Sequence, residues 1–167
     1  MGLVNLFKNI LIDKAIKEKI AFLKTCPIFS RLEDFEMRKV YNIMFQKTYP
    51  ANDLIFEEGK IGKALFFILS GNISILKKRT DNKEKEIAKL HAGDFFGEMA
   101  LLEELPRSAS VKTNEPTKVY LIYKSNFDEL ISSNPKIGIK IILNIVKILS
   151  SRLRNTSASI TSETKGD

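Results

Sequence analysis

The chain has 167 residues, of which 44% are hydrophobic and 28% charged, so it holds enough apolar material for one packed domain with extensions. Its single cysteine, Cys26, excludes an intrachain disulfide and a cysteine-based metal site. The formal net charge of +7 leaves nucleic-acid binding open, but the lysines are spread along the chain, which favours a solvated basic surface that attracts anionic ligands. No apolar run approaches the ~18 residues of a membrane span and no signal peptide is visible, so we expect a soluble, cytoplasmic protein.

Helices are expected first. Residues 3–24 repeat apolar side chains at helical spacing between lysines, which predicts one or two amphipathic helices that end before Pro27. This segment, assigned with its neighbours as an N-terminal helical extension over residues 1–25, could pack on the domain or on a partner. Residues 30–33, Ser-Arg-Leu-Glu, have the pattern of a capping box, so we expect a second helix from there to about Phe45.

A series of short strand patterns follows, separated by turn residues. Residues 70–72, Ser-Gly-Asn, carry the signal of a tight hairpin, and Asn52 suits a turn position with positive φ. The expected strands are 54–56, 64–69, 73–76, 87–91, 111–113 and 118–123. Many short strands with regular turns indicate an antiparallel sandwich or barrel. The fold class is therefore expected to be α+β, mainly β: an antiparallel β-roll or jelly-roll barrel with flanking helices.

Two more helices are expected at the C-terminus. Residues 125–128 have the pattern of an N-cap for a short helix that ends near Ser133. Asn134 and Pro135 then begin a long helix that runs to about Arg154. Its apolar stripe is too wide for one surface to cover, so one face could pack on the barrel and the other on a second copy. The main domain is assigned to residues 26–158, followed by a polar, disordered tail over residues 159–167.

Residues 93–111, GDFFGEMALLEELPRSASV, combine the features of an anion site. Gly97 lets a backbone come close to a ligand, and the short helix expected over residues 98–103 leaves the N–H groups of 97–100 without intrahelical partners. Such donors suit an anion, and the Arg107 guanidinium can bind two phosphate oxygens at once. Glu98 would repel phosphate, so it suits a hydroxyl. Together these groups describe a site for the ribose and phosphate of a nucleotide.

This stretch closely resembles the phosphate-binding cassette of cyclic nucleotide-binding domains. The family pattern, F-G-E-(L/M)-A-L-(L/I) followed by P-R-(S/T/A)-A-x-V, is met by residues 96–102 and 106–111, and the opening strands around residues 55–59 and 65–71 are also similar. The resemblance implies that Arg107 binds the cyclic phosphate and Glu98 the ribose 2′-hydroxyl. It implies that Gly97, Met99 and Ala100 supply backbone donors and small wall residues. Ser108 and Ala109 follow the arginine in the ligand site, and the resemblance implies that the Ser108 position supports the phosphate and can also contact a guanine amino group.

The same resemblance points to four positions outside the cassette. Ile87 and Leu90 are similar to apolar residues that line the pocket, although plain core packing is an equal alternative. Thr156 and Ser157 are similar to a Thr-Ser pair that contacts adenine at the end of the long helix in the catabolite activator class. One departure concerns Glu104, where many members have glycine: with Glu103 it places negative charge near the phosphate, which weakens binding if these side chains face the pocket.

The resemblance implies a stand-alone regulatory domain that binds a cyclic nucleotide, cAMP on the pattern of Thr156 and Ser157, and signals through the long helix. No cofactor, metal or catalysis is expected, because there is one histidine, His91, and no nucleophile arrangement. A second copy and an unidentified downstream protein are the expected partners, and no DNA-binding module is expected in this chain. Two alternatives stay open: a domain that dimerises without ligand, and a cGMP sensor, since Ser108 suits either base.

Overall fold

The computed structural model describes residue 14, residues 16–81 and residues 83–163. For residues 155–163 it describes only the backbone, which is helical. The described residues form eight strands in two four-stranded antiparallel sheets, of order β1-β8-β3-β6 and β2-β7-β4-β5. The strands are β1 (Phe45–Tyr49), β2 (Leu54–Phe56), β3 (Ala64–Ser70), β4 (Asn72–Lys78), β5 (Glu84–His91), β6 (Phe95–Phe96), β7 (Ser110–Thr113) and β8 (Thr117–Tyr123). The mainly β, roll-like class is confirmed, although the two sheets do not close into a barrel.

The segment before β2 differs from the prediction. Helix α2 (Asp34–Asn42) begins after Glu33 rather than at Ser30, because a capping box joins Glu33 to Glu36 and residues 30–31 belong to a turn after the 3₁₀-helix η1 (Pro27–Phe29). Residue 45 begins β1, which pairs with β8, instead of ending a helix. The sequence did not reveal β1 because four of its five side chains are exposed, so its pattern is polar rather than alternating.

The expected hairpin at Gly71 is wrong. β3 and β4 lie in different sheets, so the chain crosses from one sheet to the other at this turn, while β4 pairs with β5 in register from Asn72↔His91 to Lys78↔Glu84. Gly71 has φ of +89°, and a Cβ there would lie 2.5 Å from the Thr117 Oγ1. Only glycine allows the chain to turn so close to β8. Asn52, by contrast, has the positive φ, 61°, that its sequence context suggested.

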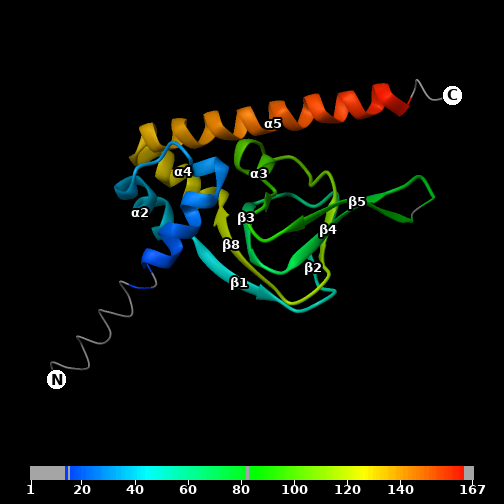
Figure 1. The fold of residues 1–167 in the computed structure, drawn as a ribbon, viewed down its shortest axis with the longest axis horizontal. Helices are drawn as coiled ribbons and strands as arrows, with labels where there is room; N and C mark the ends of the chain where they lie inside the picture. Colours follow the sequence, from blue (N-terminus) through cyan, green and yellow to red (C-terminus); the bar gives the residue numbers. More distant parts are fainter. Residues whose placement is uncertain (1–13, 15, 82, 164–167) are drawn as a thin grey trace.

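Two apolar clusters explain why β3 is apolar at every position from residue 64 to residue 69. Phe66 and Ile68 face the second sheet, where they pack with Ile73, Val111 and their neighbours. Leu65 and Phe67 face the opposite side, where they pack with the helices. A strand that is covered on both faces cannot show the alternation of a half-exposed strand. The helices that cover this second face are α2, α4 (Lys124–Ser133) and the helical residues 16–25, which lie together at one end of the sheets (Figure 1).

The long helix α5 (Pro135–Glu163) extends over the sheets and past the short helix α3 (Met99–Leu102) (Figure 1). It begins where the sequence predicted but ends later than Arg154, so residues 159–163 of the expected disordered tail are helical, and residues 164–167 lie outside the described part. α4 likewise begins at Lys124, and Ser125 is not its N-cap. One face of α5 is buried through Ile137, Ile141 and Ile145.

Polar contacts fix the first half of α5 to the helices beneath it. The Lys140 Nζ lies 2.7 Å from both carboxylate oxygens of Glu36, which is 5% exposed, and the Asn144 side chain donates to the Ile28 carbonyl at 3.1 Å. Ile20 and Leu23 of the N-terminal helix are buried in the same core. The opposite face of α5 leaves Ile139, Leu143, Val146 and Leu153 exposed. No helix of the described residues is long and apolar enough to cross a bilayer.

Candidate functional site

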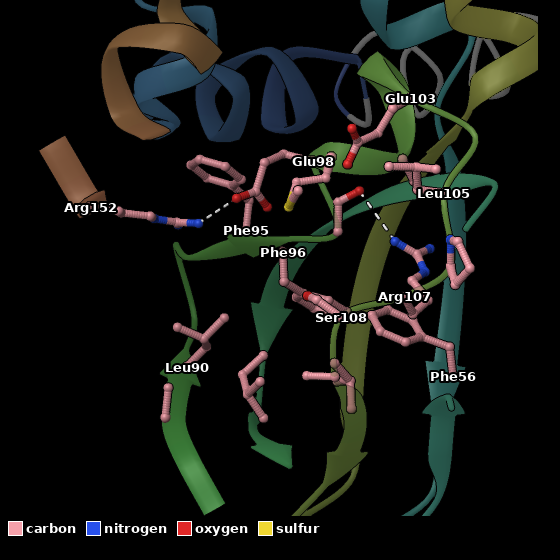
Figure 2. A pocket seen from close by; sticks show the side chains of 18 residues that line it. Phe56, Leu90, Phe95, Phe96, Glu98, Glu103, Leu105, Arg107, Ser108 and Arg152 are labelled. Atoms are coloured by element: carbon pink, nitrogen blue, oxygen red, sulfur yellow. Dashed lines mark hydrogen bonds and ion pairs between the residues drawn. The ribbon is translucent and has the colours of Figure 1, made fainter. Parts of the chain in front are cut away.

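A pocket of about 350 Å³ opens between the second sheet, β6 and α3 (Figure 2). It brings together all the cassette residues that the sequence singled out: Gly97, Glu98, Met99, Ala100, Arg107, Ser108 and Ala109. The strands add apolar side chains on one side: Phe56, Ile75, Ala88, Leu90, Phe95, Phe96 and Val111. The pocket therefore has a polar end, built by the cassette, and an apolar wall, built by the sheet.

The cassette takes its shape from β6 and from one glycine. β6 pairs with β3, which fixes the chain up to Phe96, and Gly97 then adopts φ of +77°. The chain turns there into α3, whose first backbone bonds run from the Ala100 N–H to the Gly97 carbonyl at 3.2 Å and from the Leu101 N–H to the Glu98 carbonyl at 3.0 Å. The expected donor at Ala100 is thus already engaged within the turn.

Arg107 is fixed at the floor of the polar end. Its Nη2 donates to the Ala64 carbonyl at 2.9 Å and its Nη1 to the Gly97 carbonyl at 3.3 Å. The guanidinium lies 4.0 Å from the ring centroid of Phe56, an arrangement favourable for a cation over an aromatic face. A Cβ on Gly62 or Gly97 would come within 2.9 or 2.7 Å of the guanidinium, so two glycines form the slot that holds it.

The surroundings of Arg107 suit an anion. Burial lowers its pKa, an effect that the negative charge of Glu98 opposes, but an arginine side chain stays charged at neutral pH. Its two hydrogen bonds go to backbone carbonyls, which do not neutralise the charge. A half-buried guanidinium that is hydrogen-bonded to neutral carbonyls and keeps further N–H groups is a strong site for a phosphate oxygen.

Glu98 is paired with Arg152 of α5. The Arg152 Nη1 lies 2.6 Å from the Glu98 Oε1, and the Glu98 side chain is 8% exposed. The Arg152 guanidinium also lies 4.9 Å from the ring centroid of Phe95. Figure 2 shows Arg107 and Arg152 on opposite sides of the pocket, with Glu98 nearer to Arg152. The sequence had not assigned a role to Arg152 because it lies far along the chain from Glu98.

Of the two apolar residues expected in the pocket wall, Ile87 and Leu90, only Leu90 lies there. Leu90 lines the pocket, together with Ala88, but Ile87 does not and is 54% exposed. Ala88 and Leu90, two residues apart, share one face of β5, whereas Ile87 is the extra residue of a bulge, between Glu86, which pairs with Leu76, and Ala88, which pairs with Ile75. Both the pocket role and the core role that the sequence suggested for Ile87 are therefore wrong. Phe56, which lies against Arg107, was not identified as a site residue from the sequence.

The remaining expectations are placed as follows. Glu103 lines the pocket, whereas the exposed Glu104 does not. Thr156 and Ser157 belong to α5, but their side chains lie outside the described residues. Among the residues that are described, no group of three or more His, Cys, Asp or Glu side chains could hold a metal ion. The chemistry available in the pocket is thus recognition of an anion, of a nearby hydroxyl and of an apolar ring.

Comparison with known proteins gives a consistent set of similarities. A family model described as the cyclic nucleotide-binding domain matches residues 46–134. A cAMP-dependent protein kinase regulatory subunit of Aspergillus fumigatus is 35% identical over 75% of this chain and 30% of its own length. The Cyclic AMP receptor protein of Thermus thermophilus is 29% identical over 83% of this chain and 62% of its own length. The chain therefore spans less than two thirds of these relatives.

Solved structures agree with this result. A cyclic nucleotide-binding domain from Methylobacillus flagellatus has a TM-score of 0.79 and 27% identity, covering 93% of this chain and 87% of that one. The regulatory domain of Toxoplasma gondii PKA, solved with cAMP, has a TM-score of 0.72 and 26% identity, covering 83% of this chain and 51% of that one.

Proposed function

Because the chain belongs to the cyclic nucleotide-binding domain family, we propose that its pocket binds a cyclic nucleotide, with the phosphate at Arg107 and the ribose hydroxyl at Glu98. The observation that carries this proposal is the guanidinium of Arg107, which is held in the pocket by backbone carbonyls and Phe56. A cation that is already positioned requires little reorganisation when an anion binds. The apolar side chains from the sheet suit the base.

We propose cAMP as the ligand, since the relatives named above carry cAMP in their names and one solved neighbour was bound to it. Ser108 lines the pocket and keeps a guanine base as the alternative. Glu103 also lines the pocket, so its carboxylate should lower the affinity for a phosphate. No cofactor, metal or catalytic step is part of this proposal: the domain would act as a regulator in the cytoplasm.

The ion pair between Glu98 and Arg152 supplies a route from the ligand to α5. A ribose hydroxyl that bonds to Glu98 adds to, or competes with, the contact that Arg152 makes at 2.6 Å. For this contact to act as a switch, the ligand must bind one arrangement of α5 more tightly than another. The exposed apolar face of α5 is the surface through which a second copy, or a downstream protein, would receive the change.

Calorimetric titration of ligand-free protein with cAMP and cGMP, beside the variant Arg107→Ala, tests the proposal. Loss of a charge-assisted contact should cost about 1.5–3 kcal/mol, which is more than tenfold in the dissociation constant. Arg79→Ala is the matched control, because Arg79 is also an arginine but lies at the surface near Asp81, outside the pocket.

Micromolar cAMP binding that is lost in Arg107→Ala and kept in Arg79→Ala supports the proposal, and the ratio of the two nucleotides ranks the bases. Verified ligand-free protein that binds neither nucleotide up to millimolar concentration contradicts it. A protein that then still dimerises is better described as an interaction module with the same fold.

A further inference from the structure

The pocket is lined in part by apolar side chains that solvent still reaches. Among the large apolar residues that are exposed, two line the pocket: Met99, which is 47% exposed, and Leu105, which is 58% exposed. Met99 is the first residue of α3 and directly follows Glu98, the residue proposed to bind the ribose hydroxyl. A ligand that fills the pocket would therefore remove apolar surface of Met99 from water, which favours binding.

Met99 differs from its neighbours in the pocket because its side chain contains sulfur. Of the described residues that line the pocket, it is the one methionine, and none is a cysteine. A thioether that solvent reaches is oxidised by peroxides to a sulfoxide, which turns a flexible apolar side chain into a polar one. The alkyl side chain of Leu105 has no such reaction. The pocket therefore contains one side chain whose polarity an oxidant can change.

The other sulfur groups of the described residues are shielded from an oxidant. Met37 and Met44 are 4% and 9% exposed, and Cys26 is 1% exposed. Burial also raises the pKa of the Cys26 thiol to about 11, so little of the reactive thiolate is present at neutral pH. Met1, the fourth methionine of the chain, lies outside the described residues. Among the sulfur groups that the structure describes, Met99 is thus the one that a dissolved oxidant reaches first.

We propose that Met99 is a site of reversible oxidation, at which a peroxide converts the thioether to a sulfoxide and lowers the affinity of the pocket for its ligand. The sulfur attacks one oxygen of the peroxide, and a sulfur–oxygen bond forms as the oxygen–oxygen bond breaks. The proton on the transferred oxygen passes to the leaving oxygen, which departs as water or an alcohol. The sulfur is thereby oxidised by two electrons and the peroxide is reduced by two. The effect on affinity rests on the proposed function, whereas the reaction at the sulfur does not.

Two physical effects connect the oxidation to the affinity. A ligand that covers a sulfoxide must remove water from a strong hydrogen-bond acceptor, whereas before oxidation it removes water from an apolar group. The new oxygen also adds partial negative charge to a pocket that already contains the carboxylates of Glu98 and Glu103. Both effects disfavour an anionic ligand. Conversely, a bound ligand should slow the oxidation, because it covers the side chain of Met99.

The reactive site is tested first, on the full chain treated with hydrogen peroxide in the absence and in the presence of saturating cAMP. Mass spectrometry of the proteolytic peptides follows the gain of one oxygen at each methionine separately. Without ligand, we expect Met99 to be oxidised several times faster than Met37 and Met44, because only Met99 is exposed. With cAMP bound, the oxidation of Met99 should slow, while the rates at Met37 and Met44 change little.

The effect on affinity is tested by calorimetric titration with cAMP before and after peroxide, on the wild type, Met99→Leu and the matched control Met44→Leu. Each protein is compared with itself, so the starting affinities need not be equal. Oxidation should weaken binding by roughly three- to tenfold in the wild type and in Met44→Leu, and should leave Met99→Leu at its own starting value. Methionine sulfoxide reductases for both epimers should restore the wild type. Without any oxidant, Met99→Gln, which resembles the sulfoxide in polarity, should bind more weakly than Met99→Leu.

The possible failures are distinguishable. If Met37 or Met44 is oxidised as fast as Met99, the proposed site is wrong. If the wild type binds cAMP but oxidation of Met99 leaves the affinity unchanged, or if Met99→Leu loses as much affinity under peroxide, the regulatory role is wrong and the proposed function stands. If the untreated wild type binds no cAMP, the proposed function fails and the effect on affinity fails with it, whereas the order of oxidation still tests the site.

Urea unfolding of the oxidised protein separates an effect at the pocket from a loss of the fold. Because Met99 is half-exposed, its oxidation should change the free energy of unfolding little. An oxidised protein that is unfolded under the conditions of the titration would place the cause in the fold and overturn the role of Met99 in the pocket.

Discussion

Replacement of Gly97 by alanine separates backbone strain from the loss of the anion site. Gly97 has φ of +77°, and a side chain in this left-handed region costs about 1–2 kcal/mol. A Cβ would also lie 2.7 Å from the Arg107 Nη1 and 3.0 Å from the Ala64 carbonyl oxygen. The nearer atom is the end of a flexible side chain, so we expect the guanidinium to leave its slot rather than the fold to open.

The expected result has two parts. The free energy of unfolding of Gly97→Ala should fall by about 1–2 kcal/mol from backbone strain, with a few tenths more from the contact with Ala64. The dissociation constant for the cyclic nucleotide should rise by more than tenfold, because the displaced guanidinium loses a charge-assisted contact of about 1.5–3 kcal/mol. Urea unfolding at pH 7 gives the first quantity, and calorimetric titration gives the second.

Gly93→Ala is the control for strain alone. Gly93 has a similar φ of +94°, but a Cβ there would meet nothing within 4 Å. Its unfolding free energy should fall by a similar amount while nucleotide affinity stays at the wild-type value. If Gly97→Ala also keeps wild-type affinity, the guanidinium does not lie packed beneath Gly97 and the reasoning about the slot is refuted. If both variants lose affinity equally, strain and not the slot is responsible.

Two further predictions concern α5. Desolvation raises the pKa of Glu36, but hydrogen bonds from Lys140 and from the Glu33 backbone, with the charges of Lys140 and Lys39, outweigh it, so the pKa is lowered overall. The stability from this lowered pKa is present above the unfolded carboxyl value of about 4.3 and is lost as pH falls through the folded value. Glu36→Gln should therefore lower the free energy of unfolding by about 1–3 kcal/mol at pH 7, measured by urea unfolding. A difference between the variant and the wild type that stays constant down to pH 3 would contradict the lowered pKa of Glu36. The second prediction is that sedimentation velocity shows a dimer for the wild type and a monomer for Val146→Asp. Because Val146 is 52% exposed, the substitution should change the free energy of unfolding little. A monomeric wild type would rule out a second copy on this face of α5.

The cassette was predictable because its information is local. The residues from Gly97 to Ala109 lie in one short stretch, and their roles follow from residue type: a glycine where the chain must turn, a short helix, and an arginine after a proline. The structure places all the predicted cassette residues at one pocket. The long helix from Pro135 was equally visible, since proline at its first position and a continuous apolar pattern are local signals.

Strand partners, by contrast, depend on contacts between distant segments. The turn at Gly71 has the composition of a hairpin, but β3 pairs with β6 and β8 while β4 pairs with β5 and β7, and no local pattern distinguishes these outcomes. β1 was missed for the same reason: its polar residues form a strand only because β8 is available beside it. Propensity is a weak guide wherever tertiary pairing decides.

The sequence by itself therefore determined the family, the mainly β class and the cassette, because each is written in contiguous residues whose chemistry and backbone preferences are local. Only the tertiary structure decided what surrounds that cassette. It placed Phe56 against the Arg107 guanidinium, paired Glu98 with Arg152 from α5, and brought Lys77 to the carbonyl of Ser108. Each of these contacts joins segments far apart in the chain, and their free energy exists only once the sheets and α5 have packed together.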